Sequence, residues 1–244
     1  RLEGFVAYGF RDDKFKYGIS GKWLLEKKSR FTLFGGSRRD VEQIGASLTS
    51  STDVLGRSLA SSAVFTAGSN DKLSNINLTN FGFSLEPFRN LEFRWDGSFR
   101  KISSASPTFS LDFNDTSSPT GISSEVNQFE SRLSLAYYPK REMTGFGVER
   151  KEKNDNFARL FAQVTRGDKN WFDSDFDYTK LQFSYIQPWQ VGGFGRLTTS
   201  VEAGKTFGEV PLALLSVVPG NQTYFSIYNT FPQLEFYEFV TDTF

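Results

Sequence analysis

Apolar and charged residues alternate strictly between Leu91 and Arg100, and this pattern restricts the possible folds more than any other feature. The odd positions are Leu91, Phe93, Trp95, Gly97 and Phe99, and the even positions are Glu92, Arg94, Asp96, Ser98 and Arg100. Successive side chains of a β-strand point to opposite faces of its sheet. The period of two therefore predicts a strand with one apolar and one charged face.

The same alternation recurs along most of the chain. Further strands are predicted at Phe15–Glu26, Phe129–Tyr138, Ala158–Thr165, Tyr178–Gln187, Gly195–Lys205, Thr223–Asn229 and Leu234–Thr241. The well-patterned segments are about 9 to 12 residues long, which suits a tilted membrane strand better than the usual strand of a soluble sheet. We expect roughly ten to twelve strands in one all-β domain that spans residues 1–244.

The composition favours a membrane β-barrel over a soluble β-sandwich. Aromatic residues make up 16% of the chain, with 27 Phe, yet the mean hydropathy is only −0.39. A membrane barrel combines these properties because its interior is polar while its lipid face and interfacial girdles collect aromatic residues. The longest nearly continuous apolar run, Pro211–Val218, is far shorter than the ~20 residues of a membrane-spanning helix.

Several classes of chemistry are excluded by the residues that the chain lacks. It contains no Cys and no His, which removes thiolate nucleophiles, Ser-His-Asp triads and imidazole metal sites. We therefore predict no catalytic residues, no cofactor and no metal site. Basic and acidic residues number 28 each, so no net charge attracts nucleic acid to the chain as a whole.

The charged faces of the predicted strands supply the candidate site. We expect seven residues to face the barrel lumen: Glu92, Arg94, Asp96, Arg100, Glu130, Arg132 and Arg159. They could line a path for a solute. The favoured interpretation is that they neutralise one another inside a plugged or narrow barrel, because balanced charge gives no selectivity by sign.

Three segments between strands invite specific interpretations. Asp173–Asp177 spaces three carboxylates like the opening of a calcium loop, but Tyr178 and Ser184 stand where an EF-hand needs Gly and Glu, so a solvated loop at the membrane interface is favoured. Gly192–Gly195 suggests a phosphate loop, but no strand-to-helix transition and no following Lys-Ser/Thr accompany it, so a turn or bulge is favoured. Val210–Gln222 contains two prolines and predicts a bent strand pair, with a segment folded into the lumen as the alternative.

Six blocks spread over almost the whole chain carry a family resemblance: Glu3–Gly18, Arg39–Gly45, Asp177–Leu181, Ala203–Pro211, Pro219–Gln222 and Tyr237–Asp242. They resemble an outer-membrane barrel family of unknown function found in Bacteroidota. Members of that family often carry an N-terminal carboxypeptidase-regulatory-like domain. The resemblance implies that such a domain precedes Arg1 and that the barrel continues beyond Phe244. It brings no established activity.

We therefore expect an antiparallel, transmembrane outer-membrane β-barrel, present here as an incomplete portion of a larger barrel. The expected function is that of a non-enzymatic transport or assembly component of the bacterial outer membrane, in contact with lipid and with other envelope proteins. Two alternatives remain. One is a secreted or periplasmic β-sandwich that binds glycans through exposed aromatics such as Trp171 and Trp189, and the other is an outer-membrane hydrolase.

Overall fold

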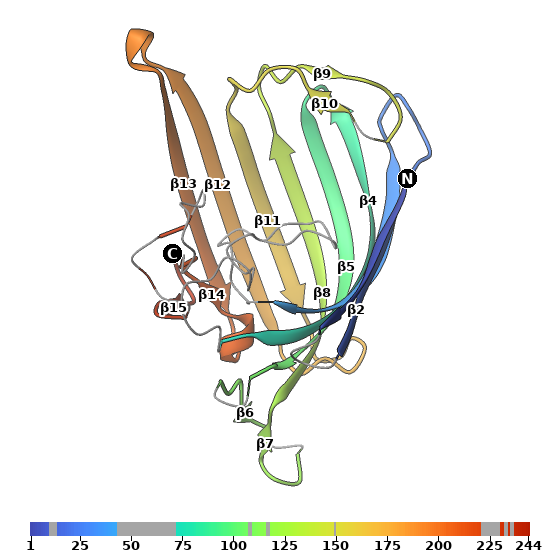
Figure 1. Ribbon diagram of the computed structural model, residues 1–244, viewed down its shortest axis with the longest axis vertical. Helices are drawn as coiled ribbons and strands as arrows, with labels where there is room; N and C mark the ends of the chain where they lie inside the picture. The colour runs from blue at the N-terminus through green and yellow to red at the C-terminus, as the bar shows by residue number, and fades with distance from the viewer. Residues whose placement is uncertain are drawn as a thin grey trace.

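A computed structural model describes residues 1–9, 14–42, 72–106, 109–115, 118–148, 150–220, 230–231, 234 and 237–244. Nine long strands form one antiparallel sheet in which each strand pairs with the next (Figure 1). They are β1 (Leu2–Gly9), β2 (Lys14–Leu24), β3 (Thr32–Glu42), β4 (Ser74–Phe88), β5 (Leu91–Ser104), β8 (Glu125–Tyr137), β11 (Arg159–Gly167), β12 (Tyr178–Gln190) and β13 (Arg196–Phe207). Within these ranges the structure contains no helix with the length and hydropathy of a membrane-spanning helix.

Shorter elements connect or flank the long strands. They comprise β6 (Phe113–Asn114) with β7 (Ile122–Ser123), β9 (Met143–Thr144) with β10 (Lys151–Glu152), β14 (Ser216–Val217) with β15 (Val240–Thr241), and the 3-10 turns η2 (Gly192–Phe194) and η3 (Leu212–Leu214). The predicted turn at Gly192–Gly195 is confirmed, since η2 joins β12 to β13. Gly192 and Gly195 have positive φ there, a conformation that glycine adopts without strain.

The predicted all-β, antiparallel class is confirmed, and β2, β5, β8, β11, β12 and β13 lie where the alternation placed strands. Thr223–Asn229 falls outside the described residues. Of the strand predicted at Leu234–Thr241, only β15 is present in the described part, because Tyr237–Phe239 forms a turn and bends.

The main sheet is strongly curved but not closed. β1 and β13 are its two edge strands and do not pair with each other. Part of the β13 edge is covered by the last residues of the chain, since the backbone of Gly204 exchanges hydrogen bonds of 2.9 and 3.0 Å with that of Phe244. The nine strands thus form an open, trough-shaped sheet whose concave side faces the viewer in Figure 1.

The two faces of the sheet have the reverse of the polarity found in a soluble protein. In β8, Leu133 and Leu135 are 44% and 46% exposed on the convex face, whereas Ser134 between them is 4% exposed on the concave face. The pattern extends across the sheet. The buried polar side chains of the concave face include Ser20, Arg38, Asn80, Asp96, Ser98, Glu130, Arg132, Gln163, Thr165, Gln182 and Ser184, while Val6, Ile19, Trp23, Phe81, Val164, Leu181, Phe183 and Val201 are exposed on the convex face.

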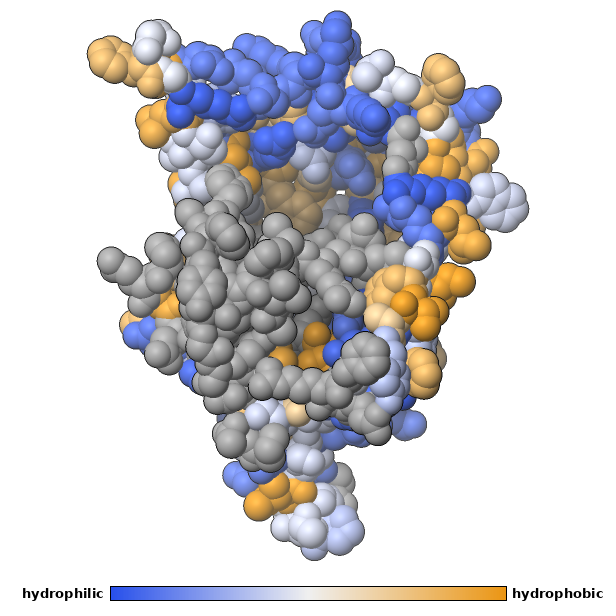
Figure 2. Space-filling view, viewed as in Figure 1, coloured by the Kyte–Doolittle hydropathy of each residue, from blue (hydrophilic) through white to orange (hydrophobic). Residues whose placement is uncertain are grey.

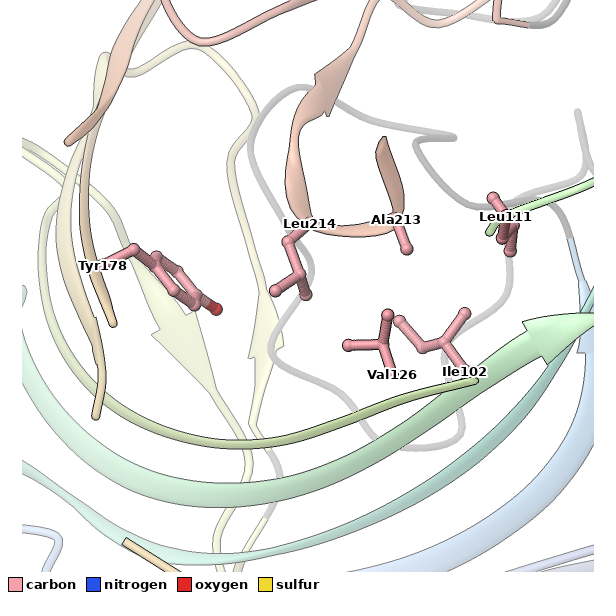
Figure 3. Packing of buried hydrophobic residues seen from close by; sticks show 6 residues of the cluster. All are labelled: Ile102, Leu111, Val126, Tyr178, Ala213 and Leu214. Atoms are coloured by element: carbon pink, nitrogen blue, oxygen red, sulfur yellow. The ribbon is translucent and has the colours of Figure 1, made fainter. Parts of the chain in front are cut away.

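One end of the trough holds a hydrophobic cluster. Ile102, Val126 and Tyr178 project from the concave face, and Ala213 and Leu214 of η3 pack against them together with Leu111 (Figure 3). The Lys180 ammonium fixes this segment by donating a hydrogen bond to the carbonyl oxygen of Leu214, at 2.9 Å.

The bent strand pair predicted at Val210–Gln222 is therefore wrong. Among the described residues of that segment only β14 is a strand, and η3 lies on the concave side of the sheet. The physical reason is local. Leu212–Leu214 is a continuous apolar run that cannot alternate between two faces, and Ile102 and Val126 provide an apolar patch on an otherwise polar concave face.

Candidate functional site

The first charged group on the concave face is centred on Asp96, in the middle of β5. Its carboxylate accepts hydrogen bonds from Nε of Arg94 at 3.2 Å and from Nε of Arg132 at 2.8 Å. A second nitrogen of Arg132 lies 2.6 Å from the same carboxylate. Asp96 is fully buried, so one carboxylate balances two guanidinium groups away from water. We call these three residues the Asp96 cluster.

The strand register explains why this cluster forms. Asp96 is the direct cross-strand partner of Arg132 in β8 and of Gly82 in β4. A Cβ atom at position 82 would stand 2.3 Å from the carbonyl oxygen of Trp95 and 2.8 Å from Cβ of Asp96. Gly82 is therefore required for the close approach of β4 to the backbone on which Asp96 lies.

The second charged group lies nearer the hydrophobic cluster. The carboxylate of Glu130 accepts a hydrogen bond from Arg100 at 3.1 Å and another from the hydroxyl of Tyr178. Tyr178 also belongs to the hydrophobic cluster that receives η3. The Glu130 group thus joins the polar wall of the trough to the segment that fills one of its ends.

A row of uncharged polar side chains extends the concave face toward β12. The hydroxyl of Ser134 donates to Oε1 of Gln163 at 3.1 Å, and Nε2 of Gln163 donates to Oε1 of Gln182 at 2.9 Å. All three side chains are buried. These side chains therefore supply hydrogen-bond partners to one another, which buried polar groups require.

A pocket lies at the opposite end of the trough from η3. Its volume is about 330 Å³, and we call it the rim pocket. Its lining residues are Lys22, Arg30, Thr32, Phe34, Ser84, Leu85, Glu86, Glu92, Arg94, Arg141, Met143, Val148 and Arg150. Figure 2 shows the hydrophilic residues gathered along this rim above a hollow on the open side of the molecule.

The loop between β9 and β10 forms the roof of the rim pocket and is held there by arginines. Arg150 donates to both carboxylate oxygens of Glu86 at 2.5 and 2.6 Å, and Arg141 contacts the same carboxylate at 3.0 Å. Arg30, in the β2–β3 connection, donates to the carbonyl oxygens of Gly147 and Val148, each at 3.0 Å. Burial lowers the pKa of Arg30, and the positive charge of Arg150 lowers it further.

The seven residues predicted to face the lumen lie in four places. Arg94, Asp96 and Arg132 form the Asp96 cluster, and Arg100 and Glu130 form the second group. Glu92 lines the rim pocket. Arg159 is separate from these groups, because its guanidinium pairs with Glu152 of β10 at 2.9 Å and lies over the ring of Phe157.

Five charged residues of the rim pocket were not predicted from the sequence: Lys22, Arg30, Glu86, Arg141 and Arg150. Lys22 lies at an even position of β2, on the same face as Ser20, so the alternation in the sequence could have placed it on the concave face. Arg30, Arg141 and Arg150 lie outside the long strands, where periodicity carries no information, and Glu86 lies beside the irregularity between Leu85 and Phe88 in β4.

The Asp173–Asp177 segment organises a loop through its carboxylates. Asp175 accepts a hydrogen bond from the amide of Asn127 at 2.6 Å, and Asp177 accepts one from the amide of Lys169 at 2.7 Å. Burial raises the pKa of Asp175. No group of three or more acidic residues that could hold a metal ion occurs in the part of the chain that the structure describes.

The fold and these groups define an antiparallel β-sheet protein with an apolar convex face and a charged, partly filled concave face. Comparison with protein families gives the particular assignment: residues 1–243 match the C-terminal domain of a family of unknown function, DUF5686. The chain belongs to this family. No curated protein and no solved structure matches it.

Proposed function

We propose that this chain forms part of a bacterial outer-membrane β-barrel that serves in transport or outer-membrane assembly and has no enzymatic activity. The observation that carries the proposal is the reversed polarity of the sheet. In water, the row of exposed aromatic and aliphatic side chains on the convex face would form a large apolar patch, which soluble monomers avoid. In a bilayer the same row is the lipid-facing surface.

The lengths of the strands support the same environment. β4, β5, β8 and β12 contain 15, 14, 13 and 13 residues, and a tilted strand needs ~9–11 residues to cross the hydrocarbon core. These strands reach across the core and extend beyond it. The hydrogen bonds between neighbouring strands satisfy the backbone groups that lipid cannot satisfy.

Aromatic residues gather where an interfacial girdle would lie. Phe99 and Phe129 stand near one end of the convex face, and Phe172 packs on both with ring centroids 5.0 and 4.8 Å away. Trp171 adds an edge contact to Phe129 at 5.9 Å. Toward the other end, Trp189 is exposed near the end of β12. Aromatic belts of this kind mark the two membrane interfaces of transmembrane barrels.

The proposal requires that the two edge strands of the trough be covered within the membrane. An open sheet edge cannot face lipid, because its amide and carbonyl groups would lose their hydrogen bonds. We infer that β1 and β13 are completed by additional strands or by another envelope protein. A source in Bacteroidota and an N-terminal carboxypeptidase-regulatory-like domain, both implied by the family resemblance, stay predictions.

The glycan-binding β-sandwich remains the second candidate, and the exposed ring of Trp189 is the observation in its favour. A sandwich places the apolar faces of two sheets against each other. In the described ranges, the apolar face of the nine-stranded sheet points outward and no second sheet covers it. This arrangement favours the barrel.

Membrane fractionation of cells that express the full-length protein tests the proposal. We expect the protein in the outer-membrane fraction, soluble only in detergent, and migrating faster on a gel when it is not boiled, because a barrel resists unfolding in cold detergent. A monodisperse protein that remains soluble without detergent would contradict the barrel. Loss of glycan binding on Trp189→Ala in that soluble protein would favour the sandwich instead.

A further inference from the structure

We propose that the rim pocket is a binding site for a small, soluble solute that carries a phosphate group. This inference goes beyond the proposed function and does not depend on it, because the pocket is built from contacts within the described chain. The two proposals can fail independently. The protein could insert into membranes and bind no phosphate, or it could bind phosphate and not insert.

The charge of the pocket lining is the first argument. Five basic side chains line it, against two acidic ones, Glu86 and Glu92. The chain as a whole has equal numbers of basic and acidic residues, so positive charge is concentrated at this rim. A cleft whose lining carries an excess of positive charge attracts anionic ligands.

Two of the five cations form no ion pair with a carboxylate of the described residues. The side-chain hydrogen bonds of Arg30 in this part of the chain go to the carbonyl oxygens of Gly147 and Val148, which bear no net charge. Within the described residues neither Arg30 nor Lys22 forms an ion pair. The hydrogen bonds of Arg30 to the roof fix the direction of its guanidinium, which has five N–H donors and so keeps donors for a ligand.

The other cations complete the wall of the pocket. Arg141 and Arg150 share the carboxylate of Glu86, so two positive charges face one negative charge. Arg94 bonds to Asp96 and stacks on the ring of Phe34, with its guanidinium carbon 3.8 Å from the ring centroid. Stacking fixes the plane of a guanidinium, and a fixed planar fork suits the paired oxygens of a phosphate.

Size and position indicate the source of the phosphate group. A volume of about 330 Å³ is at the lower end of the range for small-molecule sites. The pocket opens on the concave face, where polar side chains predominate, whereas the exposed apolar side chains that could hold the acyl chains of a lipid lie on the convex face. A phosphorylated soluble solute therefore fits the site better than the headgroup of a lipid.

Isothermal titration calorimetry with inorganic phosphate tests the site, using the full-length protein in detergent and phosphate-free buffer. We expect saturable binding of one phosphate per chain. The double variant Lys22→Gln, Arg30→Gln should weaken binding at least about tenfold, because each change removes a charged donor. The Gln at position 30 keeps an amide donor for the roof carbonyls.

Two controls separate a built site from general charge. Lys101→Gln with Arg166→Gln removes the same charge at the other end of β5 and β11 and should leave the affinity unchanged. Glu92→Gln should strengthen binding about threefold or more, since it removes a carboxylate that repels the ligand. If the Lys22→Gln, Arg30→Gln variant does not fold, Glu92→Gln alone still tests the proposal.

Three results would overturn the proposal. One is the absence of saturable binding up to about 10 mM phosphate. Another is equal weakening by the two double variants, or weakening by Glu92→Gln. The last concerns the source of the phosphate group. We expect glucose 6-phosphate to displace inorganic phosphate from the pocket. Displacement by short-chain phosphatidic acid but not by glucose 6-phosphate would contradict a soluble ligand.

Discussion

Asp96→Ala is expected to lower the free energy of unfolding by ~3–5 kcal/mol, the range measured when one partner of a buried ion pair is removed. Asp96 is 0% exposed and lies within hydrogen-bonding distance of both Arg94 and Arg132. Without its carboxylate, two guanidinium groups would remain close together on the concave face with no charge between them. The cost arises because both guanidinium groups lose their shared buried counter-charge, in addition to the lost hydrogen bonds.

Urea unfolding of the detergent-solubilised protein, followed by tryptophan fluorescence, measures this effect. Asp155→Ala is the matched control, because Asp155 also pairs with an arginine, Arg196, but its side chain is 74% exposed. Exposed pairs contribute ~0–1 kcal/mol. Equal losses for the two variants would mean that water reaches Asp96 and that the centre of the trough is open.

Leu135→Arg should reduce the stability of the bilayer-inserted protein by ~2–4 kcal/mol, the cost of a cation near the midplane on the lipid face of a barrel. Leu135 lies in the middle of the sheet, opposite Phe93 on one side and Ala162 on the other. In a soluble protein the same change at a half-exposed position would alter stability by only about 0.5 kcal/mol. The size of the free-energy change therefore distinguishes a convex face in lipid from one in water.

Phe194→Arg provides the control for this substitution, and refolding into phospholipid vesicles provides the measurement. Phe194 is 96% exposed in the η2 turn, beyond the ends of the strands, where an arginine should cost ~0–1 kcal/mol. Similar free-energy changes at positions 135 and 194 would be inconsistent with a lipid-facing convex surface.

The alternation in the sequence predicted which residues share a face, and the structure shows why it succeeded only in part. β5 begins at the predicted Leu91 but continues past Arg100 to Ser104. The alternation fails beyond Arg100 because Ile102 is apolar on the polar face, where it packs against η3. That contact joins residues more than one hundred positions apart, and periodicity carries no information about it.

The candidate site was predictable to a similar extent. Asp96 and Arg132 were both expected on the charged face of their strands. They become cross-strand partners because β5 and β8 lie side by side in the sheet. The rim pocket could not be foreseen, because Arg30 and Arg150 come from connections between strands and meet only after the sheet has curved. The equal numbers of basic and acidic residues in the whole chain also gave no indication that five basic and only two acidic side chains line this rim.

The orientation of β8 in a membrane tests the central claim most directly, and the absence of native Cys makes the measurement simple. Single cysteines at positions 132 to 137 would carry a nitroxide label in vesicles, and the collision rates with oxygen and with a water-soluble nickel complex would be compared. We predict oxygen access at Leu133, Leu135 and Tyr137, and low oxygen access at Arg132, Ser134 and Ala136. Equal nickel access at all six positions, or the opposite alternation, would contradict a convex face in lipid.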